Sequence, residues 1–333
     1  MHIELLVVGL LLVVFIVVDA LWTTLWVDGH AGPFTRRYTS MARLIFWRVT
    51  SRRNHRLMSV SGPVVLVSTV FTWGLCLWLG WVLTFSADPG SLIRVSTRAP
   101  ATLVDRIYFT GYAIATLGNG DIAPNRGIWE LATSVASLSG LFVLTLTVTY
   151  VLTVLDAVVE KRSFASHVIT LGRTAEAFIL NAWTGSDFRG VELQIVSLTE
   201  QLNRVSEQHQ AYPMLHYYHE EREIQSVPLG LAIYDDAMML FAFAVRAEVR
   251  PSPSALRAAR EAASVYLNTL KTAYIAPTKL VAPPPDLERL RQAGIPLVGD
   301  DEIEQALRIN EERRRLLKGF LDSEHRDWPL SRG

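Results

Sequence analysis

One six-residue loop decides the fold of this chain: Thr116-Leu117-Gly118-Asn119-Gly120-Asp121. It follows a short apolar helix candidate, Leu103 to Ala115, and precedes a long apolar run that begins at Ile128. Glycine adopts backbone angles that other residues avoid, so glycines at alternate positions can turn successive carbonyl oxygens toward one side. Irregular backbone at membrane depth is tolerated only where it is buried in protein or lines a water-filled path. The loop therefore predicts such a path if its flanking segments cross a membrane.

Three apolar runs are long enough to cross a membrane as helices: Ile3 to Val27, Val64 to Phe85 and Ile128 to Leu155. Each exceeds the roughly 20 residues that a helix needs to cross about 30 Å of hydrocarbon. Charged residues make up only 19% of the chain, and soluble domains usually carry about 25%. The first run lacks the basic start and the small-residue cleavage site of a signal peptide, so we predict a helix of the mature protein, with a cleaved leader as the alternative.

The loop between the first two runs orients the chain. Apart from Asp28 at its start it contains no acidic residue, and it carries seven arginines: Arg36, Arg37, Arg43, Arg48, Arg52, Arg53 and Arg56. By the positive-inside rule this loop is cytoplasmic, so the N-terminus and residues 86–127 face outward and the C-terminal half is cytoplasmic. We therefore expect a multi-pass protein of the cytoplasmic (plasma or inner) membrane. Residues 38–49 mix apolar side chains with arginines, which is typical of a helix lying on the inner leaflet of the lipid bilayer.

Asp19 is the acidic residue in the interior of the first run, whose other acidic residue, Glu4, lies at its start. An intramembrane carboxylate is a functional candidate by default. Asp19 lies near the predicted cytoplasmic end, however, where it could reach headgroup water or pair with a loop arginine. We expect this surface role rather than a part in a proton pathway.

The composition excludes several classes of function. Basic and acidic residues balance at 32 each, and no strongly basic domain is present that would bind nucleic acid. The single cysteine, Cys76, rules out an intrachain disulfide and a cysteine metal cluster. No arrangement of nucleophile, paired carboxylates or phosphate-binding loop stands out, so we expect no enzymatic activity and no cofactor.

The order of elements around the loop resembles the pore module of potassium channels: outer helix, pore helix, Thr-x-Gly-x-Gly-Asp filter and inner helix. The resemblance covers roughly residues 64–155. It implies an all-α membrane protein with three transmembrane helices and a re-entrant pore helix and filter in each subunit. It also implies a homotetramer, because each chain has one loop, and passage of a monovalent cation, K⁺ or alternatively Na⁺, whose water the filter oxygens replace. The implied ion-binding residues are Thr116, Leu117, Gly118, Asn119 and Gly120.

Two filter positions depart from the pattern of potassium-selective members. Asn119 stands where those proteins carry Tyr or Phe, and Ala115 stands where they carry a further threonine. Tyr108 and Phe109 replace the tryptophans often found on the pore helix. Because the filter aromatic of the family packs against those rings, Asn119 implies a filter that is wider, more hydrated or braced by amide hydrogen bonds. A non-selective cation channel is therefore an alternative to a potassium channel.

Two alternatives come from outside the channel class. Gly118, Gly120 and Ala123 also fit Gly-x-Gly-x-x-Ala, the dinucleotide-binding fingerprint. That fingerprint needs a preceding strand and a following soluble helix, which are not predicted here. The second alternative is a membrane-anchored sensor or scaffold whose loop does not conduct, and the two departures from the filter pattern keep it open.

The third apolar run would form the inner helix. Gly140 lies 20 residues after Gly120, at the usual hinge position of the family, although close helix packing explains a mid-helix glycine equally well. Asp121 and Glu130 place carboxylates near the outer mouth, where they could concentrate cations, and for Glu130 we favour an ordinary surface role. The same alignment directs four apolar side chains to the conduction path, where they could gate by dewetting: Leu141, Leu144, Val148 and Leu152.

From Ser166 onward the pattern predicts a helical cytoplasmic domain. We thus expect three domains: 1–62 with the first helix and the basic loop, 63–165 with the pore module, and 166–333. Helices are expected over 229–249, 252–276 and 300–323, with Asp300 as an N-cap. Five residues form a short heptad seam that predicts either a coiled coil or packing within the chain: Val191, Ile195, Leu198, Leu202 and Val205.

One cluster in this domain holds most of the potential metal ligands: His209, His216 and His219, with Glu220 and Glu221. The spacing matches no established zinc signature, so we favour a solvated or proton-sensitive patch over a metal site. The cluster is a candidate pH sensor.

Overall fold

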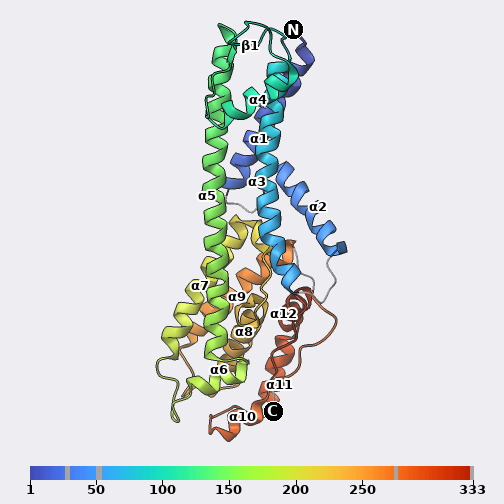
Figure 1. The fold of residues 1–333 in the computed structure, drawn as a ribbon. Coiled ribbons are helices and arrows are strands. Elements are labelled where there is room, and N and C mark those ends of the chain that lie inside the picture. The colour runs from blue at the N-terminus through green and yellow to red at the C-terminus, as the bar shows by residue number, and fades with distance from the viewer. Residues whose placement is uncertain (27–30, 50–54, 274–276, 331–333) are drawn as a thin grey trace. The chain divides into compact units, whose positions relative to one another are not determined.

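The computed structural model describes residues 1–26, 31–49, 55–273 and 277–330, and the chain divides into two compact units (Figure 1). The first unit comprises Met1–Trp47 and Pro63–Val154, and the second comprises Arg48–Gly62 and Leu155–Gly333. Arg52 and Arg53 of the basic loop lie outside the described residues.

Long helices build the first unit. They are α1 (Ile3–Leu25), α2 (Pro33–Val49), α3 (His55–Ser86), α4 (Leu103–Ile114) and α5 (Ile128–Leu171), although the start of α3 and the end of α5 after Val154 belong to the second unit. α1, residues 58–86 of α3, and α5 are long and apolar enough to cross a membrane. The predicted all-α membrane fold is therefore confirmed. α5 continues beyond the predicted end at Leu155 because no glycine or proline interrupts the sequence before Gly172.

Glycines bring α1 and α3 into close contact. A Cβ atom on Gly9 would lie 2.7 Å from the carbonyl oxygen of Gly80 and 2.6 Å from Thr84 Oγ1. Small residues allow membrane helices to approach in this way. α1 is thus packed closely against α3.

Asp19 does not have the predicted surface role, because its side chain is fully buried. Its carboxylate accepts hydrogen bonds from the backbone N–H of Phe34 (2.8 Å), the Thr35 hydroxyl (2.6 Å) and Trp73 Nε1 (3.1 Å). The first N–H groups of a helix have no intrahelical partner, and a capping side chain usually accepts from them. Asp19 of α1 therefore caps the start of α2 from a neighbouring helix.

The second unit is a helical bundle centred on α8 (Val227–Phe243). Every residue from Val227 to Phe241 is buried. The helices that pack against α8 include α6 (Ala175–Ala182), α9 (Pro253–Ala273) and α12 (Glu311–Ser323). The unit also contains α7 (Val191–Ala211), the 3-10 helices η1 (Pro213–Tyr217) and η2 (Glu223–Gln225), α10 (Leu287–Gln292) and α11 (Asp300–Ile309).

The predicted heptad seam on α7 lies in the core of this unit. All five of its residues are buried, and α7 packs along α9. The seam therefore serves packing within the chain, and the coiled-coil alternative is wrong.

The helix predicted over 300–323 is two helices that meet at Asn310. The Asn310 side chain donates to the carbonyl oxygen of Ala306 at 2.7 Å and accepts from Arg260 Nη2 at 2.5 Å, which holds the chain at this break. Gly299, and not Asp300, is the N-cap residue of α11. Asp300 instead occupies the first turn, where its charge still suits the positive end of the helix dipole.

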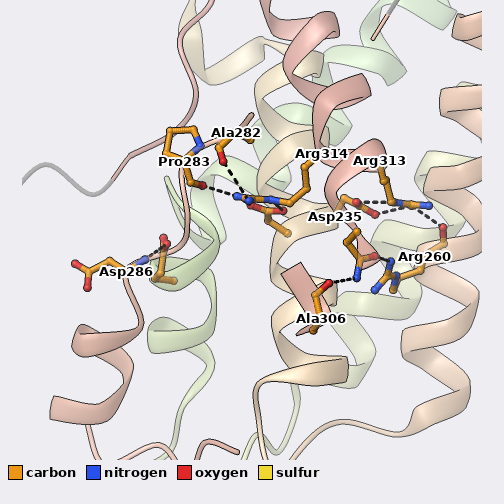
Figure 2. A network of polar contacts seen from close by, with 11 residues as sticks. Asp235, Arg260, Ala282, Pro283, Asp286, Ala306, Arg313 and Arg314 are labelled. Atoms are coloured by element: carbon orange, nitrogen blue, oxygen red, sulfur yellow. Dashed lines mark hydrogen bonds and ion pairs between the residues drawn. The ribbon is translucent and has the colours of Figure 1, made fainter. Parts of the chain in front are cut away.

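Two adjacent ion pairs join α8 to α12 (Figure 2). Arg313 donates to the Asp235 carboxylate at 2.7 and 2.6 Å. Arg314 donates to the Asp236 carboxylate at 2.9 and 3.0 Å. Sequence analysis missed these pairs. Two acids in an otherwise apolar helix were the available signal, because a buried charge needs a partner.

Candidate functional site

Short strands close the loop that carries residues 116–121. β2 (Ile122–Pro124) follows the loop and pairs antiparallel with β1 (Leu92–Arg94). Strands of three residues are too short to show an alternating pattern, which is why the sequence did not predict them. The loop is therefore fixed between α4 on one side and a small sheet on the other.

α4 begins with a capping box. The Asp105 carboxylate accepts from the backbone N–H of Thr102 at 2.8 Å, and the Thr102 hydroxyl accepts from the backbone N–H of Asp105 at 3.3 Å. Arg94 of β1 also pairs with Asp105 at 2.8 Å. The predicted short helix is confirmed, and its start is held by reciprocal caps of a recurrent kind.

α4 lies between α3 and α5 (Figure 1) and is anchored on α3 by aromatic residues. Trp78 Nε1 donates to the carbonyl oxygen of Ile107 at 3.0 Å. Phe109 is buried and meets the ring of Phe85 edge-on at 5.4 Å. Phe109 thus anchors the pore helix candidate on α3, whereas the sequence had placed it beside the loop.

The backbone of the loop alternates in conformation. Thr116, Gly118 and Gly120 have φ angles of +58°, +62° and +80°. The φ angles of the intervening Leu117 and Asn119 are not positive. Glycine adopts positive φ freely, but a β-branched residue rarely does, so Thr116 is strained. Such strain persists only where neighbouring structure holds it. The positive φ angles fall on alternate residues, and the lining of one side by carbonyl oxygens stays a prediction.

The start of the loop is tied back to the end of α4. The backbone N–H of Thr116 donates to the carbonyl oxygen of Ala113 at 3.1 Å, and that of Leu117 donates to Tyr112 at 2.9 Å. Residues 115–121 are nevertheless exposed in the single chain. The loop is therefore held by its base while its own surface stays uncovered.

Two tyrosines on one face of α4 hold the far part of the loop. Asn119 Nδ2 donates to the Tyr108 hydroxyl at 2.6 Å, and the Tyr112 hydroxyl donates to the buried carbonyl oxygen of Ile122, also at 2.6 Å. The two rings meet edge-on with centroids 5.1 Å apart. The sequence suggested a filter that is wider, more hydrated or braced by amide hydrogen bonds at Asn119. The structure contains such an amide hydrogen bond. Sequence analysis missed Tyr112, although its spacing of four residues from Tyr108 places both on one helix face.

The two carboxylates assigned to the mouth have different surroundings. The Asp121 side chain is exposed beside the loop, while its backbone carbonyl accepts from the N–H of Val95 at 3.0 Å. Glu130 accepts from the backbone N–H of Gly127 at 3.1 Å, at the start of α5. This contact is the ordinary role favoured for Glu130.

Gly140 contacts the end of α4. A Cβ atom at this position would collide with the backbone carbonyl group of Ile114. Trp81 of α3 donates to the Ser139 hydroxyl at 2.9 Å, so α3 and α4 both contact α5 at this level. Close packing accounts for the glycine, and the hinge role stays a prediction.

α5 presents one apolar face to its own chain and another to the outside. Val143, Thr147, Tyr150 and Val154 are buried within the chain. The four residues predicted to face a conduction path are each more than half exposed: Leu141, Leu144, Val148 and Leu152. Their spacing of three or four residues places them along one side of the helix.

The predicted histidine cluster does not converge on one point. The ring centroids of His209 and His216 lie 6.4 Å apart, and those of His216 and His219 lie 6.5 Å apart. Among the described residues, no three His, Cys, Asp or Glu side chains are placed to hold a metal ion. Burial, with Lys161 nearby, lowers the pKa of His209 to about 3, so this residue is neutral at physiological pH. His209 therefore does not fit the predicted sensor.

The acidic members of this region are paired. His219 Nδ1 lies 2.6 Å from the Glu324 carboxylate, and Lys161 lies 3.0 Å from that of Glu220. Burial raises the pKa of Glu220 against the opposing effect of Lys161. Burial also acts against ionised Glu324, but the charge and hydrogen bond of His219, together with the charges of Lys161 and Arg326, lower the pKa of that carboxyl. A proton-sensitive role for these pairs stays a prediction.

Comparison with known proteins places the loop in a recognised domain. A family model described as "Ion channel" matches residues 71–157, which include α4, the loop and much of α5. The "Uncharacterized membrane protein YdjJ" of Bacillus subtilis is 38% identical over 325 residues, which is 97% of this chain and 94% of that protein. No solved structure matches the chain. The chain therefore belongs to the same family of membrane proteins as YdjJ, and it contains the pore-loop domain of ion channels.

Proposed function

We propose that this protein is a homotetrameric potassium channel whose selectivity filter is formed by residues 116–120. The observation that carries the proposal is the alternating backbone of the loop, with positive φ at Thr116, Gly118 and Gly120. Alternation of this kind suits a path in which backbone carbonyls replace the water around a cation. The loop lies within the domain that the family model matches.

The exposed surfaces of the single chain support assembly around a shared axis. One loop cannot surround an ion, and residues 115–121 lie exposed. The apolar residues Leu144 and Val148 of α5 are also more than half exposed. In a tetramer these residues would line the conduction path below the filter, where an apolar ring can gate by dewetting. Asp121 would stand at the outer mouth.

The hydrogen bond between Asn119 and Tyr108 supports potassium selectivity. A carbonyl-lined filter discriminates between cations by the number and spacing of its oxygens. The side chain of Asn119 is fixed to α4 at 2.6 Å, and Tyr112 fixes the following strand at the same distance. These contacts take the place of aromatic packing in holding the width of the filter.

We also propose the topology that the arginines of residues 36–56 favour. The N-terminus and the filter mouth face outward, and the second unit is cytoplasmic. The permeant ions then enter the cell past Asp121 or leave it past the apolar face of α5. Transport is passive, since no ATP site or inverted repeat stands out in the sequence.

Cation flux into liposomes containing the purified protein tests this proposal. Gly120→Ala should abolish K⁺ flux, because alanine is strained at a φ of +80°. Gly127→Ala is the matched control, since Gly127 has a φ of +86° and equally open surroundings but lies outside the loop. We expect the control to conduct normally, with K⁺ flux well above Na⁺ flux.

Three results would contradict the proposal. Equal K⁺ and Na⁺ flux would make the protein a non-selective channel. Equal loss in both glycine variants would show that backbone strain alone causes the defect. A wild type without ion flux is also compatible with a closed gate, and Leu144→Asn distinguishes the two cases because its amide should hydrate the apolar path. If that variant also shows no ion flux, a non-conducting scaffold is the better account.

A further inference from the structure

A cavity of about 630 Å³ opens in the second unit between the end of α8 and the first half of α9. Small-molecule sites usually measure ~300–1,000 Å³, so the cavity can hold a metabolite. Its apolar part includes Phe243, Pro253 and Leu256. A second cavity of about 380 Å³ shares Arg260, Ser264 and Arg313 with the first and extends it toward α12.

Arginines dominate the charged lining of the larger cavity. Arg250, Arg257, Arg260 and Arg313 line it, and Glu261 is the one carboxylate among its described lining residues. The guanidinium of Arg313 is already neutralised by Asp235 at 2.6 Å. The remaining arginines give the cavity an excess of positive charge, which attracts anions.

Arg260 is the central feature of this excess charge. Figure 2 shows it beside the Asp235–Arg313 pair. Its Nη2 donates to the neutral side chain of Asn310 at 2.5 Å. Its Nη1 is buried and has no hydrogen-bond partner among the described residues. Burial lowers the pKa of Arg260, which reflects the cost of holding this charge with so little compensation. A buried guanidinium is normally paired with a carboxylate or a phosphate.

The surroundings of Arg260 combine charge with an aromatic surface. Its guanidinium lies over the ring of Phe243, 5.1 Å from the centroid, and that ring remains 45% exposed. Arg257 lies one helical turn before Arg260 on α9, is exposed, and makes no hydrogen bond or ion pair with the described residues. A guanidinium fork can bind phosphate oxygens in pairs.

We propose that this cavity binds a small organic phosphate, with Arg257 and Arg260 as phosphate ligands and with Phe243 and Leu256 contacting its apolar body. Arginine recognises the phosphate, and the aromatic and aliphatic side chains distinguish an organic phosphate from the free ion. Because binding is measured without conduction, this proposal can fail or succeed independently of the potassium channel.

Thermal unfolding of the full-length protein in detergent, at constant ionic strength, provides the test. The probes are ATP, AMP, glucose 6-phosphate and inorganic phosphate, with sulfate as a control for anions in general. We expect at least one organic phosphate to raise the unfolding temperature more than inorganic phosphate or sulfate does, because a ligand that binds only the folded state stabilises it. Its affinity is then measured by calorimetry.

Variants locate the binding. Arg257→Gln should weaken binding at least about tenfold, as expected for loss of a charge-assisted hydrogen bond. Arg289→Gln is the matched control, because Arg289 is exposed on α10 and does not line the cavity. Arg260→Lys keeps the charge but removes the planar fork, and it should weaken binding too.

Three outcomes would overturn the proposal. The first is no stabilisation by any organic phosphate. The second is equal affinity in Arg257→Gln, Arg260→Lys and Arg289→Gln, which would place binding elsewhere. The third is an effect of inorganic phosphate or sulfate as large as that of every organic probe, which would reduce the cavity to a general anion site.

Discussion

The two units of the molecule bury polar side chains for different purposes. In the first unit, buried polar groups bind the backbone: Asp19 accepts from the N–H of Phe34, and Tyr112 donates to the carbonyl oxygen of Ile122. In the second unit, buried charges also bind each other, as in the pairs Asp235–Arg313 and Asp236–Arg314, and Arg314 donates to the carbonyl oxygens of Ala282 and Pro283 as well. The first pattern satisfies irregular backbone, and the second links two helices.

The helices long enough to cross a membrane account for the backbone contacts in the first unit. A segment within lipid cannot satisfy its free N–H and C=O groups with water, so side chains must do so at helix starts and loops. In the second unit, the buried ion pairs in addition constrain which residues face each other. We infer that Asp19 and Tyr112 protect backbone groups, whereas Arg313 and Arg314 fix the register of α12 on α8.

Breaking the Asp236–Arg314 ion pair should give the largest loss of stability. Arg314→Leu leaves the Asp236 carboxylate buried without its partner and should lower the unfolding free energy by about 3–5 kcal/mol. Urea unfolding of the full-length protein in detergent measures it, and Trp328 is a local fluorescence probe because Arg314 lies over its ring.

The double variant Asp236→Leu/Arg314→Leu is the control for this result. It removes both charges and should recover much of the loss, although the carbonyl oxygens of Ala282 and Pro283 also lose their donor. If the double variant were as unstable as the single one, the lost packing of Arg314 would explain the effect better than the unpaired charge.

Removing the Asp19 cap of α2 should give the next largest loss of stability. Asp19→Leu leaves the N–H groups of Phe34 and Thr35 without their acceptor, and each buried group of this kind costs about 1–3 kcal/mol. We expect a total loss of about 3 kcal/mol, and a smaller loss for Asp19→Asn, which keeps one acceptor oxygen. Unfolding by titration with sodium dodecyl sulfate measures both. Equal losses in the two variants would show that Asp19 acts through its charge and not as a cap.

His209 predicts a smaller, pH-dependent effect in the second unit. Burial lowers its pKa from the ordinary 6.5 to about 3, so the unfolded chain binds a proton between these values that the folded chain does not. Stability should therefore fall as the pH drops below about 6.5, by about 2 kcal/mol at pH 5 relative to pH 8. His209→Phe keeps the ring and should flatten this acid limb in thermal unfolding. An unchanged pH dependence in the variant would assign the acid limb to other groups.

The sequence predicted those features that depend on local pattern. The apolar runs define α1, α3 and α5, and the glycines of the loop predict its alternating backbone. The partners of Asp19 could not be predicted in this way, because they lie 15 and 54 residues away in the chain. No local pattern distinguishes such a cap from a surface carboxylate.

The second unit shows the same limit. The heptad seam that includes Leu198 has the same spacing in a bundle core and in a coiled coil, so only its packing on α9 decides between them. The break between α11 and α12 depends on the contact of Asn310 with Arg260, 50 residues earlier in the chain. Tyr112 could have been found from its spacing, whereas these contacts needed the fold.

The central claim is that Tyr108, through Asn119, holds a potassium-selective filter. The most direct test is the reversal potential of the reconstituted protein between K⁺ and Na⁺ solutions, for the wild type and for Tyr108→Phe, which removes only the hydroxyl that binds Asn119. Tyr38→Phe is the control, since Tyr38 lies on α2 and its ring stacks on Phe34. We predict a wild type that reverses near the K⁺ equilibrium potential, a clear shift toward Na⁺ in Tyr108→Phe, and no shift in the control. A wild type that passes both ions equally, or a Tyr108→Phe variant with unchanged selectivity, would contradict the claim.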